Sequence, residues 1–143
     1  MDYYFEGQFK NRGVVAVYMQ NLIKELGLNR LRKPYIEVAF GNKVEAYGLC
    51  VGDKDYARIE IAKKCPVHGH KLSFMEQMNC LAHEMVHARQ FLRGQLVAEG
   101  VWKWKGRNAD GYEYDNQPWE KEAYRLEKEL FYKCFPWYLP FNN

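Results

Sequence analysis

The sequence predicts an α+β fold in which a small, twisted, mainly antiparallel sheet supports a long central helix. Three observations lead to this prediction. Short alternating apolar segments before residue 63 indicate strands, an unbroken helical pattern begins at Phe74, and Pro118 opens a second long helical segment. The chain has 143 residues, so we expect a single domain over residues 1–143.

Composition limits the classes of protein to consider. Apolar residues make up 48% of the chain and aromatic residues 16%, which suffices for a core and argues against disorder. The net charge of +3 neither demands nor excludes a nucleic-acid partner. No apolar secretory segment follows Met1 and no run is long enough to span a bilayer, so we expect a cytoplasmic protein with four reduced cysteines and no membrane partner.

The segments before the central helix are predicted from periodicity and turn residues. Met1–Gly13 shows no clear period, and residues 12–26 have the pattern of a helix that packs on the core and stops at Gly27. Three strands follow, at Tyr35–Phe40, Ala46–Val51 and Tyr56–Ala62. Gly41-Asn42 forms the first turn between them, and Gly52–Asp55 reads as a hairpin turn.

The central helix has signals at both ends. Ser73 and Glu76 have the spacing of a capping box, in which each residue satisfies a backbone N–H group of the other. No proline or glycine interrupts the segment from Phe74 to Arg93, and Gly94 is a plausible stop. A long and well-delimited helix is therefore expected here.

This helix carries the motif H-E-x-x-H. His83 and His87 lie one turn apart on one face, so both imidazoles can reach one Zn²⁺ ion at about 2.0–2.1 Å. Glu84 follows the first histidine and can accept a proton from a zinc-bound water. The alternative is a surface helix with a chance pair of histidines, which the helix signals disfavour.

The candidates for the third zinc ligand are few, because the chain lacks a histidine after the motif. No histidine follows His87, so the ligand is expected from a carboxylate of the final helix, or else from His68 or His70. The helical phase places Glu120 at the edge of the buried stripe and Glu127 on the same side, and it points Glu122 and Glu129 toward solvent. A purely structural alternative for Glu120 is an acidic residue favoured by the helix dipole.

Two other segments have a functional and a structural interpretation. Cys65, His68 and His70 could form part of a second metal site, but a surface loop with exposed histidines is the favoured interpretation. Residues 101–105 and 112–114 alternate on either side of a turn, which indicates a hairpin or ordered loop. Its tryptophans and basic residues could contact nucleic acid, although inward packing of the tryptophans is favoured.

Two motifs carry a resemblance to a known family. His83-Glu84-Met85-Val86-His87-Ala88-Arg89-Gln90 and Pro118-Trp119-Glu120-Lys121-Glu122-Ala123-Tyr124 together resemble the SprT-like and small gluzincin-like metallopeptidases of phages and bacteria. The resemblance implies a zincin-like fold, with Glu120 as the third zinc ligand. It also implies a sheet edge that binds extended peptide, for which Tyr56–Ala62 is the candidate, and a location in the host cytoplasm if the protein is phage-encoded.

The expected function is that of a zinc metallopeptidase acting on a peptide or protein substrate. Zinc would activate a water molecule, and Glu84 would take its proton and deliver it to the leaving amine. Tyr112, Tyr114 and Tyr124 are candidates to stabilise the oxyanion, with aromatic packing as the alternative for each. Two other functions stay open, a zinc-dependent nucleic-acid-associated protein and a catalytically silent zinc-binding interaction protein.

Overall fold

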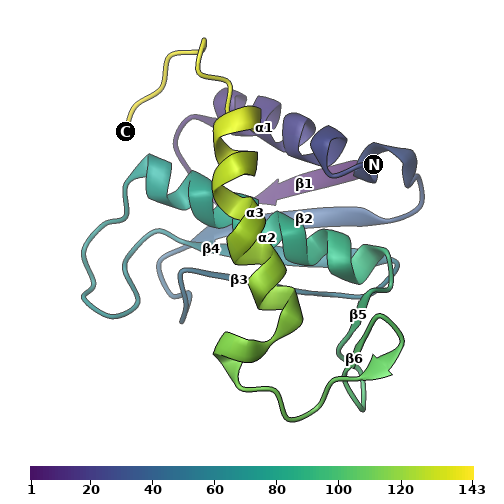
Figure 1. Cartoon of the computed structure of the whole chain (residues 1–143). Helices are drawn as coiled ribbons and strands as arrows, with labels where there is room; N and C mark the ends of the chain where they lie inside the picture. The colour runs from purple at the N-terminus through teal and green to yellow at the C-terminus, as the bar shows by residue number, and fades with distance from the viewer.

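The computed structural model describes residues 1–143 and contains three α-helices and two small sheets (Figure 1). The helices are α1 (Arg12–Glu25), α2 (Phe74–Leu92) and α3 (Pro118–Cys134), and two short 3-10 helices are η1 (Leu28–Arg30) and η2 (Tyr114–Asn116). The first sheet consists of β1 (Asp2–Glu6), β2 (Tyr35–Gly41), β3 (Gly48–Gly52) and β4 (Tyr56–Ala62). The second consists of β5 (Leu96–Val97), β6 (Lys103–Trp104) and β7 (Arg107–Asn108). The predicted α+β class is confirmed, and none of the helices has the length and apolar character needed to cross a membrane.

The strand order of the first sheet is β1-β2-β4-β3. β1 pairs parallel with β2, β2 pairs parallel with β4, and β3 alone pairs antiparallel, with β4. The prediction of a mainly antiparallel sheet is therefore wrong. After β2 the chain forms β3 at the outer edge, and it then returns as β4, which lies between β3 and β2 and runs parallel to β2. The prediction of Tyr56–Ala62 as the sheet edge is wrong for the same reason, since β3 covers β4 and forms that edge.

One face of the first sheet packs on the helices, and the alternation of burial along the strands shows which face it is. The inward residues are buried, and they are Ile36, Val38 and Phe40 of β2 with Ala57, Ile59 and Ile61 of β4. They join side chains of all three helices in one apolar core. On the opposite face, Arg58 forms ion pairs with Glu6, Glu37 and Glu60.

Helix α2 begins and ends where its sequence signals predict. The backbone N–H of Glu76 donates to Oγ of Ser73 over 3.1 Å, and the backbone N–H of Ser73 donates to Oε1 of Glu76 over 3.0 Å, which completes the capping box. At the other end, Gly94 has a φ of 70°, a left-handed conformation that glycine adopts without strain. α2 packs on β3 and β4, and α3 lies across it in front (Figure 1).

The second sheet is a small ribbon next to the start of α3 (Figure 1). β6 and β7 form a hairpin, and β5 adds a third strand to it. The expected pairing of residues 101–105 with 112–114 is wrong, because the second strand is Arg107–Asn108 and residues 112–114 form no strand. The rings of Trp102 and Trp104 lie 5.7 Å and 6.0 Å from the ring of Trp119 at the start of α3. Both tryptophans thus contact the body of the protein, but the predicted inward packing holds only in part, because Trp102 remains 37% exposed and Trp104 is half-buried.

Candidate metal centre

Three potential metal ligands from two helices meet at one point. His83 and His87 lie on α2, and Glu120 lies in the first turn of α3. Nε2 of His83 is 3.0 Å from Oε1 of Glu120, and Nε2 of His87 is 3.1 Å from the same oxygen. The three residues form a group whose ligand atoms all lie within 4.8 Å of one another, close enough to hold a metal ion.

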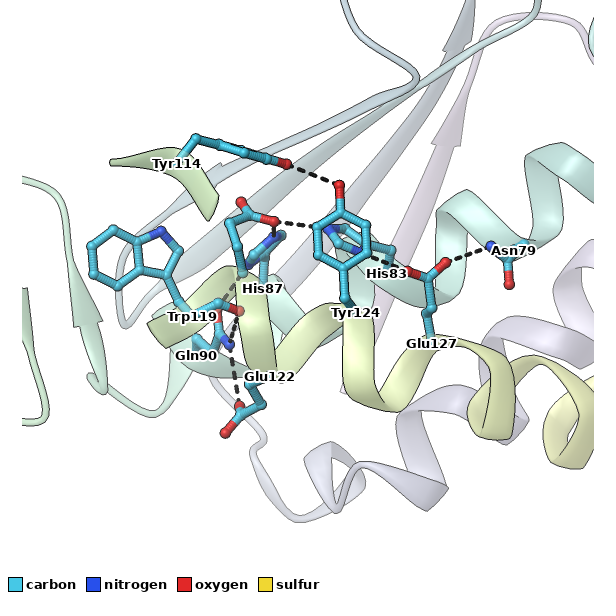
Figure 2. A network of polar contacts seen from close by, with 10 residues as sticks. Asn79, His83, His87, Gln90, Tyr114, Trp119, Glu122, Tyr124 and Glu127 are labelled. Atoms are coloured by element: carbon cyan, nitrogen blue, oxygen red, sulfur yellow. Dashed lines mark hydrogen bonds and ion pairs between the residues drawn. The ribbon is translucent and has the colours of Figure 1, made fainter. Parts of the chain in front are cut away.

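The second ring nitrogen of each histidine faces a hydrogen-bond acceptor (Figure 2). Nδ1 of His83 lies 3.3 Å from Oε1 of Glu127, and Nδ1 of His87 lies 2.8 Å from Oε1 of Gln90. An ionised carboxylate oxygen and an amide oxygen can only accept, so each Nδ1 carries a proton and donates it. The nitrogen that each histidine turns toward Glu120 is then Nε2, the atom whose protonation is free to change.

The donor set fits a zinc ion. In a neutral imidazole with its proton on Nδ1, Nε2 presents a lone pair, so His83, His87 and Glu120 direct three lone pairs at one point. Such an arrangement needs a cation between the three atoms to offset their mutual repulsion. Two imidazole nitrogens and one carboxylate oxygen are a ligand set that catalytic zinc sites use, with a further position left for water or substrate.

In the metal-free protein, protons bound to the two histidines supply this positive charge. Burial lowers the pKa of His83, but hydrogen bonds to Glu120 and Glu127 outweigh burial and raise this pKa to about 9. The pKa of His87 is raised in the same way, against the effect of burial, by its hydrogen bond to Glu120. Burial raises the pKa of Glu120, but its hydrogen bonds with the two histidines lower this pKa to about 2. The centre is therefore built to hold positive charge.

Glu84 lies beside the histidines and is almost completely buried, with 6% of its surface exposed. Burial raises the pKa of its carboxyl group to about 7, although the charges of His87 and His83 act in the opposite direction. A carboxylate with a pKa near 7 can both accept and release a proton at neutral pH, which is the property that a general base requires.

A cavity of about 230 Å³ opens directly over these residues. Residues of β3 and the segment before it line the cavity, namely Ala46, Gly48, Leu49 and Cys50. Four large apolar side chains also line it, and they are Phe91, Leu96, Trp102 and Trp119. His83, Glu84, His87 and Glu120 complete this part of the lining. The potential metal ligands therefore border a cavity that a ligand could enter.

The structure distinguishes between the three tyrosines that the sequence suggests as oxyanion stabilisers. The hydroxyl groups of Tyr114 and Tyr124 lie 3.2 Å apart, and the ring of Tyr124 lies 4.6 Å from that of His83 (Figure 2). Burial and the hydrogen bond with Tyr124 raise the pKa of Tyr114, so its hydroxyl stays protonated as a donor. Tyr112 instead packs edge-on against Trp119 and does not line the cavity over the potential metal ligands.

Glu122 and Gln90 are the residues that sequence reasoning failed to place. The prediction that Glu122 points to solvent is wrong, because its Oε1 accepts a hydrogen bond from Nε2 of Gln90 over 3.1 Å and only 17% of its side chain is exposed. Glu129, the other acid predicted to face solvent, is exposed. The signal for Gln90 was its position three residues after His87, which places both on one face of α2.

The loop between β4 and α2 does not form a second metal site. Cys65, His68 and His70 do not bring their ligand atoms together into a group that could hold an ion. The sulfur of Cys65 instead lies 3.3 Å from the hydroxyl of Tyr47, and all four cysteines are free thiols. His68 and His70 are exposed, which agrees with the favoured interpretation of this segment as a surface loop.

Comparisons with known proteins identify no family for this chain. No protein-family model matches the sequence, and no curated protein matches it. The chain is similar to the crystal structure of Wss1 from Saccharomyces cerevisiae, with a TM-score of 0.46, 10% identity and coverage of 92% of this chain and 91% of that chain. A Wss1 mutant from the same yeast gives a TM-score of 0.38 and 15% identity, with coverage of 93% and 88%.

Proposed function

We propose that this protein is a zinc metallopeptidase that hydrolyses peptide bonds in a peptide or protein substrate. The observation that carries the proposal is the convergence of Nε2 of His83, Nε2 of His87 and Oε1 of Glu120, while Nδ1 of each histidine faces an acceptor on the outer side. We assign these three residues as the zinc ligands. Zinc, when bound, supplies a Lewis acid that polarises a carbonyl group and lowers the pKa of water toward 7.

Glu84 is the proposed general base. Its carboxylate is buried beside the ligands and borders the cavity that a substrate would enter. It accepts a proton from the attacking water and then delivers that proton to the nitrogen of the leaving amine. Burial raises the pKa of this carboxyl group in the metal-free protein, which favours its return to the protonated form after it accepts the proton.

Tyr114 and Tyr124 are the proposed donors to the developing oxyanion. Tyr114 lines the cavity above the ligands, and its hydroxyl is paired with that of Tyr124. A tyrosine hydroxyl is a hydrogen-bond donor, and one turned from its present partner toward a substrate oxygen would stabilise negative charge there. We do not assign this role to Tyr112, because its ring packs on Trp119 away from the ligands.

The edge of β3 is the proposed binding surface for an extended substrate. β3 is the outer strand of the first sheet on the side of α2, and Gly48, Leu49 and Cys50 of this strand line the cavity. An edge strand presents unpaired backbone N–H and C=O groups, which a peptide can match by adding a strand to the sheet. A peptide bound in this way would pass its backbone over Glu84 and the ligands.

The proposal is tested by measuring hydrolysis of a peptide mixture by mass spectrometry, with zinc-loaded protein. The native sequence should produce cleaved peptides, and Glu84→Gln should bind zinc equally well but leave the mixture intact, because an amide cannot accept the proton. Glu129→Gln, at an exposed position of α3, is the matched control and should cleave normally. Equal cleavage by the native protein and Glu84→Gln would exclude Glu84 as the base.

A further inference from the structure

Gln90 is a buried polar residue at the junction of α2 and α3, with none of its surface exposed. Its Oε1 accepts a hydrogen bond from Nδ1 of His87 over 2.8 Å (Figure 2). Its Nε2 donates to the backbone carbonyl of Trp119 over 3.0 Å and to Oε1 of Glu122 over 3.1 Å. Every polar atom of the side chain therefore has a partner.

These partners permit a single orientation of the amide. Both partners of Nε2 are acceptors, a carbonyl and a carboxylate, so the NH₂ group must face them. A flipped amide would place its oxygen against those two acceptors and its NH₂ group against the Nδ1 proton of His87, and three hydrogen bonds, two of them buried, would be lost. The orientation of Gln90 thus fixes the Nδ1–H tautomer of His87 and directs its Nε2 lone pair to the centre.

The other half of the amide holds the first turn of α3. Trp119 and Glu122 flank Glu120 in this turn, and no side chain caps the start of the helix. Gln90 donates to the backbone carbonyl of Trp119 and to the side chain of Glu122. These two contacts join the turn that carries Glu120 directly to the residue that orients His87.

We propose that Gln90 is a positioning residue of the metal centre, which fixes His87 and Glu120 relative to each other through one amide group. The inference rests on the proposed zinc site and concerns how tightly that site holds its metal. An amide is required because one partner needs an acceptor and the other two need a donor. A carboxylate at this position could still accept from His87, but it would face the carboxylate of Glu122 and the carbonyl of Trp119.

The first experiment measures zinc affinity by competition with a chromophoric chelator. Gln90→Leu should weaken zinc binding by about tenfold to hundredfold, the effect typical of groups that orient metal ligands. Gln77→Leu is the matched control on the same helix, because Gln77 donates a single hydrogen bond to the carbonyl of Leu72 and touches no histidine. It should bind zinc within about threefold of the native protein.

The second experiment separates positioning from a general loss of stability. In the zinc-loaded native protein, long-range ¹H–¹⁵N spectra should show a slowly exchanging Nδ1 proton on each of the two histidines. Gln90→Leu should lose protection of the His87 proton and keep that of His83, which is held by Glu127. Gln90→Glu should keep the His87 proton and still bind zinc less tightly, because its contacts to α3 are gone.

The double variant Gln90→Glu with Glu122→Gln completes the test. In this variant the amide at position 122 donates to the carboxylate at position 90, so the hydrogen bond between the two positions is restored with the roles exchanged. It should recover part of the zinc affinity that Gln90→Glu loses, and no recovery would overturn the role of Gln90 in holding α3. Zinc affinity of Gln90→Leu within threefold of native, or a His87 proton that stays protected in it, would overturn the proposal as a whole. Absence of zinc binding by the native protein would instead refute the proposed function.

Discussion

Gly48 of β3 lies so close to Glu84 that a methyl group added to it would stand 2.9 Å from Cγ and from Oε2 of that side chain. Real side chains essentially never approach a neighbour so closely, so any larger residue at position 48 must move the Glu84 carboxylate. The edge strand that borders the cavity is thus also the surface that holds the proposed base in place.

Gly48→Ala is therefore expected to reduce peptide hydrolysis by about tenfold to hundredfold, since a displaced base loses part of its contribution to proton transfer. Zinc affinity should stay within about threefold of native, because the methyl group meets Glu84 and none of the ligands. Gly13→Ala is the control, since an added methyl group there meets no atom within 4 Å. A Gly48→Ala protein that hydrolyses peptides at the native rate would contradict this reading of the contact.

Glu127 is expected to contribute to zinc affinity without binding the metal. It accepts from Nδ1 of His83 over 3.3 Å, and it is held in turn by Nδ2 of Asn79 over 2.5 Å. Glu127→Ala should weaken zinc binding by about tenfold to hundredfold in chelator competition, because His83 loses the partner that orients its ring. Glu129→Ala, two residues further along α3 and exposed, should leave the affinity unchanged. Equal affinities in these two variants would remove Glu127 from the centre.

Zinc affinity should fall as the pH falls. The pKa of His83 is about 9 in the metal-free protein, so at neutral pH zinc must displace a proton from this residue. The affinity should decrease by at least about tenfold for each unit between about pH 8.5 and pH 6.5. Glu120 does not add to this effect, because its pKa is about 2. An affinity that stays constant over this range would show that no such proton is present.

The stability of the metal-free protein should have the opposite pH dependence. The pKa of His83 is raised in the folded state from an ordinary value of 6.5 to about 9. Its interactions with Glu120 and Glu127 therefore contribute fully below pH 6.5, and this contribution is lost as the pH rises through about 9. Chemical denaturation of the metal-free protein at pH 6 and pH 9.5 measures the effect, and His83→Ala should show a smaller difference between the two.

The main helices could be predicted because their signals are local. Ser73 and Glu76 cap each other, Gly94 ends α2, and Pro118 begins α3, all within a few residues of the element concerned. The motif of α2 needs only helical spacing to bring two imidazoles to one face. Pairing these histidines with Glu120 required a resemblance in addition, because helical phase alone left Glu127 and the loop histidines as alternatives.

The sheet could not be predicted in the same way. Alternation shows which face of a strand is buried, but it does not specify the neighbouring strand or its direction. The parallel pairs therefore went unpredicted, as did β1, whose half-exposed residues give a weak pattern. The prediction for Glu122 failed because it assumed that α3 packs against a single surface along one apolar stripe. The first turn of α3 contacts the core and also Gln90 of α2.

The most direct test of the account is the zinc content of the purified protein, measured after dialysis against a weak chelator. The native protein should retain about one zinc per chain. Glu120→Ala, and separately a double His83→Ala and His87→Ala variant, should each lose it, while circular dichroism checks that both are folded. A native amount of zinc in either variant would contradict the assignment of these three residues as the metal ligands.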